Sequence, residues 1–576
     1  MIYRKYLLPK AFRILLFFFI VCSSHAALAI SPLPGSVEPG RVTQNYLPTR
    51  PTGAPHAQPN VTHPEEKTSQ LGPEAEKIKF KLNKVILEGN HVYTSKELAA
   101  LYQDKLNTII SIAELEQIVQ DITNYYRNNG YILSRAILPP QHVKDGIVHI
   151  RIIEGYIDKV KIVGNPRGAE RILLDYGQKI SESRPLQLKD MEYYLLLANQ
   201  VPGVQAKAIL EPSKTETGAS DLNIAVEEQR VSAFMSYDNY GTLYIGPHQV
   251  TAGSSVNSVV RSGDMTRATY LAATHGAELH YLDVAYQTPL GAHGLQLTVG
   301  GNQSLTAPGF VLGPLDTDGI AKTYYITLQY PFILSRSQNL ILDGGFTYLD
   351  SKTTQLDTLL LYNDHIRPIK FGGTYSFGDR FGGSDSLAFH IEQGLNVLGA
   401  SDDPTSLTTS RFGADGIYTK YTAQATHLQP LFSSPFSIFL LAQGQSSNNP
   451  LLASEQFGFG GSVIGRGYDP AELLGDRGAD GSIEFRWDTF PNRFLIQNIQ
   501  FYLFYDIGEI WNIKELPGVK QFQSASSTGG GARFALTKYV SGNVMFTQVL
   551  TKSIASEELI NRGRNPKTFF SLVASV

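Results

Sequence analysis

The chain contains 576 residues, which is long enough for two to four domains. Charged residues make up only 18% of it, while glycine, tyrosine and phenylalanine number 52, 30 and 29, a composition that suits strands with one apolar and one polar face. The net charge of −3 indicates no nucleic-acid partner. The single cysteine, Cys22, lies in a segment that we expect to be removed, which excludes disulfides, thiolate catalysis and cysteine metal sites.

Residues 1–29 have the three parts of a secretory signal peptide: a basic start, an apolar run from Ile14 to Cys22, and the small-residue cleavage site Ala27-Leu28-Ala29. The apolar run is about nine residues long, against the roughly 20 that a membrane-spanning helix needs. No later run approaches that length, so the chain would have to cross a membrane as strands.

Residues 30–77 form a proline-rich segment, with nine prolines between Ser31 and Glu76 and little apolar periodicity. This composition predicts an extended, poorly ordered linker. The stretch from Val42 to Leu47 is too short to predict a helix.

Residues 78–155 predict a compact domain with the order strand, helix, helix, strand, strand. Thr94 with Glu97 and Ser111 with Glu114 are two capping boxes, each of which opens a helix. The second helix has apolar residues at spacings of three and four on one face: Leu115, Ile118, Val119, Ile122 and Tyr126.

Residues 156–228 predict a second unit with the same order, including a short helix near 169–176 and a longer one near 188–199. Such units leave a strand edge and a helix groove that can bind an extended chain through main-chain hydrogen bonds. The alternative is that they are passive spacers.

Residues 229–576 alternate apolar and polar side chains, as in Ile483, Phe485 and Trp487 against Glu484, Arg486 and Asp488. This period of two over about sixteen segments predicts an all-β transmembrane barrel of about 16 antiparallel strands after the α+β domains. The eleventh strand is expected near 436–445 and the twelfth near 481–490. A soluble β-sandwich or propeller is the alternative.

A glycine-rich stretch from Phe457 to Pro470 carries Arg466 at its tip. Asp506 lies in a later strand whose residues Phe501, Leu503, Tyr505 and Ile507 would face lipid, which places the carboxylate inside the barrel. We therefore expect Arg466 and Asp506 to pair. The alternative is an ordinary surface turn and an ordinary lumen charge.

The tip Arg466-Gly467-Tyr468 and the later Asp506-Ile507-Gly508 resemble the barrel signature of the two-partner secretion transporters of the ShlB/FhaC/HecB type, in the outer-membrane insertase superfamily. Residues 130–136, Pro140-Gln141 and Glu154-Gly155 resemble the polypeptide-transport-associated (POTRA) domain of that family. The family usually has valine or isoleucine directly before the arginine, where this chain has Gly465.

The resemblance implies that the sixth outer loop, about 447–479, folds into the barrel and is held there by Arg466, Gly467, Tyr468, Asp506 and Gly508. Glu484 and Arg486 are expected either to support this contact or to be ordinary pore-lining charges. It also implies an outer-membrane barrel with periplasmic POTRA domains, which contacts lipid and is inserted by the barrel assembly machinery. Its partner would be a large secreted exoprotein of the haemolysin or adhesin kind, bound in extended form. An assembly factor for other outer-membrane proteins and a passive porin or receptor remain alternatives.

No catalytic motif supports an enzyme, and we expect neither a cofactor nor a metal. His275 and His280 with Asp283 could in principle form the site of a barrel lipase. Single histidines on strands are more often structural, so we do not predict catalysis.

Overall fold

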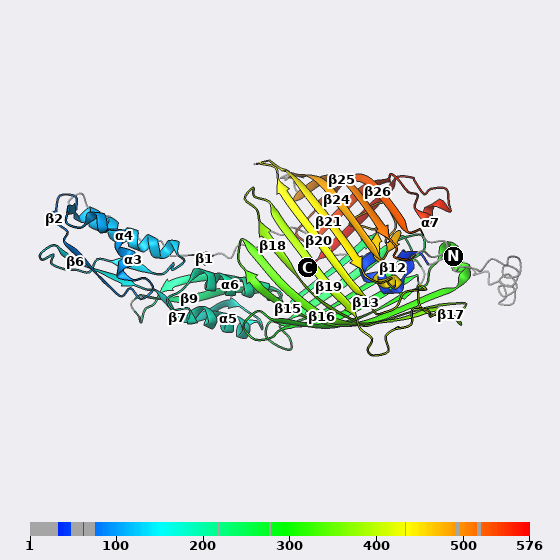
Figure 1. Ribbon diagram of the computed structural model, residues 1–576, viewed down its shortest axis with the longest axis horizontal. Helices are drawn as coiled ribbons and strands as arrows, with labels where there is room; N and C mark the ends of the chain where they lie inside the picture. The colour runs from blue at the N-terminus through cyan, green and yellow to red at the C-terminus, as the bar shows by residue number, and fades with distance from the viewer. Residues whose placement is uncertain are drawn as a thin grey trace.

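The computed structural model describes residues 33–47, 61–62, 75–216, 218–275, 278–432, 434–489, 496–514 and 520–576. Two small α+β domains lie in a row and lead into a large barrel (Figure 1). The predicted signal peptide and most of the predicted linker lie outside the described residues. In the described ranges, no helix combines the length and apolarity that a membrane crossing requires.

The first domain buries one face of a long helix against a small sheet. Both predicted capping boxes are present, Thr94 with Glu97 and Ser111 with Glu114. The five residues predicted on one face of α4 are all buried. The elements are β2 (Lys79–Lys81), β3 (Lys84–Glu88), α3 (Ser95–Ala99), β4 (Ile109–Ser111), α4 (Ile112–Asn128), β5 (Arg135–Ile137) and β6 (Ile147–Ile153).

The second domain repeats this topology. In the first domain, β3 runs parallel to β6 and β5 runs antiparallel to β6. In the second domain, the first strand (Tyr156–Asn165) runs parallel to the last (Ala219–Glu228), and the middle strand (Val204–Pro212) runs antiparallel to it. Its first helix is longer than the predicted short one. The elements are β7 (Tyr156–Asn165), α5 (Glu170–Glu182), α6 (Leu188–Gln200), β8 (Val204–Pro212) and β9 (Ala219–Glu228).

Specific contacts connect the two domains and the barrel. The amide of Leu188 donates to the carbonyl of Gly130 at 2.8 Å, which ties α6 to the end of α4. On the other side of α6, Glu192 accepts from the amide of Arg336 at 2.8 Å and lies 3.4 Å from its guanidinium. The second domain therefore sits directly against one rim of the barrel.

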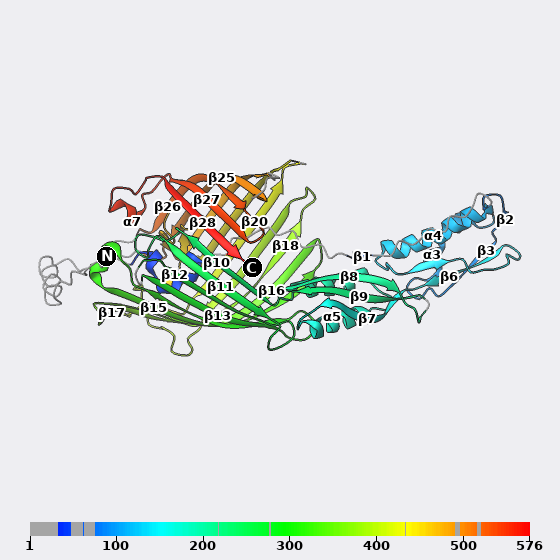
Figure 2. The same ribbon diagram turned by 180° about the vertical axis from the view of Figure 1, so that it is seen from behind.

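The barrel closes because its first strand, β10, pairs antiparallel with its last, β28 (Figure 2). Segments β17 and β18 are separated only by Arg367 and both pair with β16, so they form one interrupted strand and the barrel has 16 strands, as predicted. The first eight strands are β10 (Val231–Asp238), β11 (Gln249–Asn257), β12 (Met265–Ala273), β13 (Leu279–Pro289), β14 (Gln296–Thr306), β15 (Thr317–Leu334), β16 (Gln338–Gln355) and β17 (Leu359–Ile366) with β18 (Pro368–Gly378). The other eight are β19 (Ser384–Gly394), β20 (Thr419–Pro430), β21 (Phe436–Ser447), β24 (Arg477–Thr489), β25 (Asn498–Trp511), β26 (Phe522–Ala535), β27 (Val540–Val549) and β28 (Lys567–Ser575).

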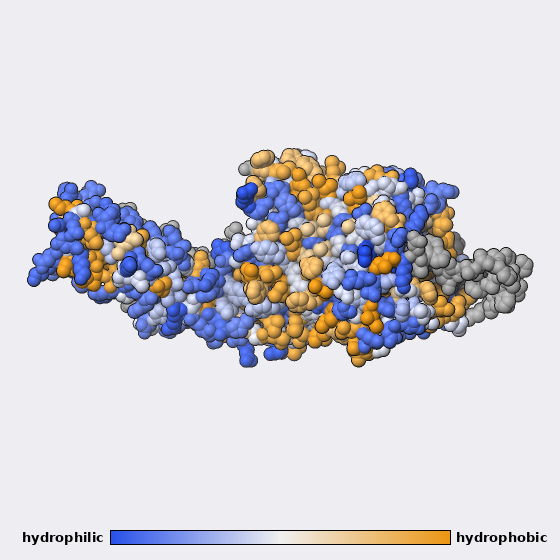
Figure 3. Space-filling view, in the orientation of Figure 1, coloured by the Kyte–Doolittle hydropathy of each residue, from blue (hydrophilic) through white to orange (hydrophobic). Residues whose placement is uncertain are grey.

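Alternation along the strands divides the wall into two faces. On β25, Leu503 is 65% exposed on the outer face, whereas Phe504 and Asp506 are buried on the inner one. Apolar side chains are frequent on the outer surface of the barrel, and polar ones dominate the two small domains (Figure 3). An apolar outer face on a closed barrel is the arrangement of strands that cross a membrane.

The N-terminal segment contradicts part of the linker prediction. Residues 33–47 form two short 3₁₀ turns, Gly35–Val37 and Pro39–Arg41, followed by helix α2, Val42–Tyr46. They lie within the barrel (Figure 1), and Val37 and Val42 are almost fully buried there. The helix was missed because five residues have too little periodicity to predict one, and it is the barrel that supplies its packing partners.

Candidate functional site

The segment between β21 and β24, the eleventh and twelfth strands, folds back into the barrel. It contains η5 (Ala453–Glu455) and a small hairpin of β22 (Phe457–Phe459) with β23 (Leu473–Gly475). Phe457 packs on Gly478 and Phe459 on Gly508, where an added Cβ would clash with the ring in each case. Because Gly508 has no side chain, the ring of Phe459 can pack directly against the wall at this position.

Arg466 reaches the wall from the tip of this loop and is 1% exposed. Its Nη2 and Nε donate to the two carboxylate oxygens of Asp506 at 2.6 and 2.9 Å, and its own amide donates to Asp506 Oδ2 at 2.9 Å. Nη2 also donates to Ser482 Oγ at 2.7 Å. Ser482 is the cross-strand partner of Asp506, so two neighbouring strands hold one guanidinium.

Glu484 is the second carboxylate of the site and is fully buried. Arg466 Nη1 donates to its Oε1 at 2.5 Å, and Arg486 Nη2 lies 2.9 Å from its Oε2. Sequence analysis named Glu484 and Arg486 but missed Arg533, whose Nη2 also donates to Glu484 Oε1 at 2.9 Å. The alternation along β26 could have put Arg533 on the inner face, but only the closed barrel shows that it reaches this carboxylate.

The site thus contains three arginines and two carboxylates, and aromatic rings cover the cations. The guanidinium of Arg466 lies 3.6 Å from the centre of the Phe504 ring, and that of Arg533 lies 3.8 Å from the Tyr502 ring. Burying charges is costly unless each is paired and hydrogen-bonded. Here each carboxylate receives several donors, so the arrangement favours one position of the loop over others.

The residues beside Arg466 fit the loop closely. Gly467 has a φ of 106°, a left-handed conformation that favours glycine, and its Cβ position is 3.0 Å from Thr547 Oγ1. Gly465, at the position where the resembled family usually has a branched residue, has a φ of 73°. Tyr468 is buried, and its hydroxyl donates to the carbonyl of Ser526 at 3.0 Å.

Further ion pairs hold the base of the loop. Lys420 on β20 lies 2.5 Å from Glu455 of the loop and 3.1 Å from Glu392 on β19. At the other end, the guanidinium of Arg411 pairs with Asp476, which is completely buried. Both ends of the loop are therefore anchored, as well as its tip.

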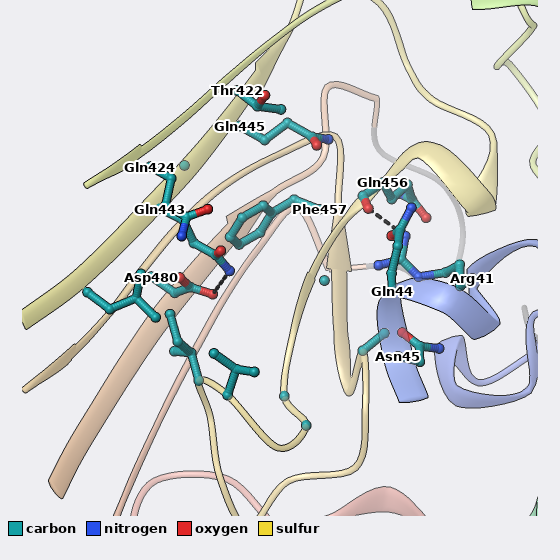
Figure 4. A pocket seen from close by; sticks show the side chains of 18 of the residues that line it. Arg41, Gln44, Asn45, Thr422, Gln424, Gln443, Gln445, Gln456, Phe457 and Asp480 are labelled. Carbon is teal, nitrogen blue, oxygen red and sulfur yellow. Dashed lines mark hydrogen bonds between the residues drawn. The ribbon is translucent and has the colours of Figure 1, made fainter. Parts of the chain in front are cut away.

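The N-terminal segment contacts this loop and the opposite wall. Arg41, which lies beside Gln456 in Figure 4, donates from Nη1 to the Gln456 carbonyl at 2.6 Å. On the wall, Ser351 Oγ of β16 donates to Glu38 at 3.0 Å. A second wall residue, Tyr362, donates to the other oxygen of Glu38. The segment thus bridges the loop and the wall across the barrel interior.

A cavity of about 410 Å³ remains beside these elements. Most of the lining residues labelled in Figure 4 are amides or hydroxyls. Those of β20 and β21 face those of α2 across the gap: Thr422, Gln424, Gln443 and Gln445 on one side, Gln44 and Asn45 on the other. Side chains of Gln443 and Asp480 are hydrogen-bonded there at 3.1 Å. A polar lining suits water or a passing main chain rather than an apolar ligand.

The structure does not bring the considered catalytic residues together. His280 contacts the Tyr270 hydroxyl at 2.8 Å among residues exposed on the outer face, whereas Asp283 is buried on the inner face and accepts from Tyr325 at 3.0 Å. His275 lies beyond the end of β12. The three residues do not form a triad.

A closed 16-strand barrel with an arginine-tipped loop folded inside and paired α+β domains at one rim defines an outer-membrane transporter. The haemolysin secretion/activation protein ShlB/FhaC/HecB model matches residues 218–534, and the ShlB-type POTRA domain model matches residues 80–155. The chain belongs to the ShlB/FhaC/HecB family, and it is placed in the bacterial outer membrane with POTRA domains in the periplasm.

Curated relatives and solved structures agree with this assignment. The chain is 24% identical over 489 residues to the heme/hemopexin transporter protein HuxB of Haemophilus influenzae (strain 86-028NP), covering 83% of this chain and 85% of the relative. It is 24% identical over 472 residues to the outer membrane transporter CdiB of Dickeya dadantii (strain 3937), covering 79% of each chain. The structure of CdiB from Escherichia coli shares the fold with a TM-score of 0.69 at 18% identity, over 89% of this chain and 93% of that one.

Proposed function

We propose that the protein exports one large exoprotein, which its POTRA domains bind in extended form and its barrel conducts to the cell surface. The observation that carries this proposal is that a loop and an N-terminal segment of the chain itself occupy the lumen and are held by buried ion pairs and hydrogen bonds. A channel closed by displaceable protein segments suits a protein substrate better than a small solute.

The POTRA sheets offer a means of binding an extended chain. The sheet of the first domain has the strand order β3-β6-β5, so β3 and β5 are its edge strands. Among the described residues, each of them pairs with a strand of this sheet on one side only. In the second domain, β8 pairs in parallel with a two-residue strand of the chain's own N-terminal part, β1 (Val61–Thr62). This pairing supports the view that the β8 edge accepts an added strand, as in other cases of recognition by strand addition.

The exported chain can pass through the barrel only if the segments that occupy the lumen move aside. The N-terminal segment is held mainly by Glu38 and Arg41, whereas the loop is held at its tip and both ends. We infer that the N-terminal segment leaves first and that the loop remains in place or shifts as a unit. No nucleotide-binding motif occurs in the sequence, so folding of the exported partner outside the cell would supply the driving force.

We propose two further partners for the barrel, outer-membrane lipid and the barrel assembly machinery. The apolar outer face of the wall would contact outer-membrane lipid, and the barrel assembly machinery would insert the barrel. The relatives include a heme/hemopexin transporter and a hemolysin transporter. Because these cargoes differ, we propose the class of partner, a secreted exoprotein, and not its identity.

The proposal is tested by an export assay of the exoprotein encoded beside this gene, in cells that carry the wild-type protein or variants of Arg41, Arg466 and Asp506. Secretion that requires this chain and falls in the Asp506→Asn variant supports the proposal. An assembly factor would instead lower the levels of other outer-membrane proteins when it is removed. A passive porin or receptor would show high resting conductance and no effect on secretion.

A further inference from the structure

A cluster of potential metal ligands lies on the outer face of the barrel, away from the loop and the lumen. It consists of Asp379, Asp385, His427 and Gln429, hereafter the rim cluster. Asp385 on β19 and His427 on β20 are direct cross-strand partners. Asp379 lies in the turn after β18, and Gln429 is two residues beyond His427. The period of two therefore places Asp385, His427 and Gln429 on one face, and the turn that carries Asp379 lies beside them at the rim that carries the POTRA domains.

Three of these residues have the geometry of a metal site. One ligand atom each from Asp379, Asp385 and His427 lie within 4.8 Å of one another. His427 Nδ1 is 2.8 Å from Asp385 Oδ1, and both side chains are only partly exposed. Two carboxylates and an imidazole at this spacing can share one ion, which would replace the hydrogen bond between His427 and Asp385.

Two further oxygens lie close together at the turn that carries Asp379. Asp379 Oδ1 accepts from the amides of Phe381 and Gly383 at 2.7 Å each, which fixes the carboxylate and leaves Oδ2 turned toward Gly383. Gln429 donates its amide nitrogen to the carbonyl of Phe381 at 3.2 Å, so its Oε1 faces the same point. A Cβ on Gly383 would lie 2.6 Å from Asp379 Oδ2 and 2.8 Å from Gln429 Oε1.

Two fixed acceptor oxygens thus converge on one space. Within the part of the chain that the structure describes, the hydrogen bonds of Asp379 and Gln429 leave Asp379 Oδ2 and Gln429 Oε1 without a donor. Converging oxygens repel each other unless a donor or a cation lies between them. The absence of a side chain at Gly383 keeps the space open.

We propose that the rim cluster binds a divalent first-row transition-metal ion such as Zn²⁺. The ligands are carboxylate oxygens of Asp379 and Asp385, an imidazole nitrogen of His427 and the amide oxygen of Gln429. Imidazole favours zinc and its neighbours over Mg²⁺ and Ca²⁺, whereas the lack of thiolates disfavours the softest ions. We expected no metal from the sequence, in which Asp385 and His427 are 42 residues apart and only the pairing of β19 with β20 brings them together.

The ion would join the turn between β18 and β19 to β20 near the POTRA contact. The amide of Gly378 donates to the carbonyl of Ser337 at 3.0 Å, and the adjacent Arg336 contacts Glu192 of α6. The site is therefore one turn away from the place where the second POTRA domain meets the barrel. The role of the ion is to keep this rim of the barrel in one conformation. This inference does not depend on the transport proposal.

The test uses the full-length protein, purified without a histidine tag in detergent and stripped of metals with EDTA. Calorimetric titration with ZnCl₂, and Co²⁺ absorption in the visible range, measure binding to the wild type and to His427→Ala and Asp379→Asn. The matched control is His390→Ala, which removes a histidine that contacts a single aspartate, Asp343, at 3.1 Å inside the barrel. Heat-modified migration on gels verifies that each variant is a folded barrel.

We expect the wild type and the His390→Ala control to bind one equivalent of zinc. We expect the affinity of both rim-cluster variants to fall about tenfold or more, with loss of the Co²⁺ bands. The proposal is overturned if the wild type binds no zinc, if both rim-cluster variants bind like the wild type, or if the control loses as much affinity as they do. Binding of Ca²⁺ at equal strength would overturn the assignment to a transition metal.

Discussion

Arg466 and Arg533 donate to the same oxygen, Glu484 Oε1, at 2.5 and 2.9 Å. One arginine comes from the loop and the other from the wall on β26, so Glu484 connects the loop to a third strand beyond β24 and β25, which hold Arg466 through Ser482 and Asp506. The contact predicted between Arg466 and Asp506 is therefore one part of a larger network. We propose that this network, hereafter the loop–barrel lock, determines the position of the loop.

Replacing Glu484 should destabilise the loop as strongly as replacing Asp506. Glu484→Gln leaves three arginines facing one remaining carboxylate, and breaking such a buried pair typically costs about 3–5 kcal/mol. We expect a lower urea midpoint and noisier conductance in planar bilayers. Glu509→Gln, on the same wall but outside the network, is the control. Unchanged conductance and stability in Glu484→Gln would show that Glu484 is an ordinary pore-lining charge.

Exchanging the charges of Arg466 and Asp506 should not restore the wild type. The carboxylate that Arg466→Asp introduces would face Glu484, and the guanidinium from Asp506→Arg could not accept the hydrogen bond that the loop's amide donates. We expect both single variants and the double variant to secrete poorly. Full recovery in the double variant would mean that the pair acts alone and that Glu484 contributes little. If neither single variant nor the double variant changes secretion, the proposed pairing of Arg466 with Asp506 is wrong.

Gly508→Ala should displace the loop through packing and not through charge. Its Cβ would clash with the ring of Phe459, and overpacking of this kind typically costs about 1–3 kcal/mol. Gly481→Ala is the control, since its Cβ would be 3.4 Å from the nearest atom, the carbonyl oxygen of Leu441. Thermal unfolding measures the difference. Adding Phe459→Ala should reduce the effect of Gly508→Ala, and additive losses would contradict the proposed contact.

Arg41→Ala should release the N-terminal segment from the loop. The variant loses the 2.6 Å hydrogen bond to the Gln456 carbonyl and two longer ones to the carbonyls of Ala453 and Ser454. We expect a higher mean conductance in planar bilayers than in the wild type. Lys96→Ala, on helix α3 of the first POTRA domain, is the control. Equal conductance in Arg41→Ala and the wild type would show that Arg41 does not hold the lumen closed.

The N-terminus of α4 should loosen as the pH falls. Hydrogen bonds from the amide and hydroxyl of Ser111 lower the pKa of Glu114 below its usual value. A carboxyl group with a lowered pKa in the folded state stabilises the fold above its ordinary pKa and loses that contribution as the pH falls through its folded-state value. Hydrogen exchange at α4, corrected for intrinsic rates, should rise below about pH 4. Ser111→Ala keeps the amide donor and loses only the hydroxyl, so it should weaken this dependence and destabilise the helix by about 1 kcal/mol; a profile equal to that of the wild type would contradict the prediction.

Local patterns in the sequence were sufficient to predict the main architecture. The capping boxes at Thr94 and Ser111 need only residues three apart, and the alternation around Asp506 needs only neighbours, so both were visible without coordinates. The same alternation placed the eleventh and twelfth strands next to the loop that carries Arg466. These features depend on short-range geometry, which the order of residues determines directly.

Tertiary structure decided which distant residues meet. Helix α2 is only five residues long and depends on the barrel for its packing, so the sequence alone predicted a linker there. Arg533 and the rim cluster are likewise assembled by the closure and register of strands, which bring together groups that the chain keeps far apart. The sequence by itself determined the elements and their faces; the closed sheet decided the charge network, because the distances between buried charges depend on how the whole wall is paired.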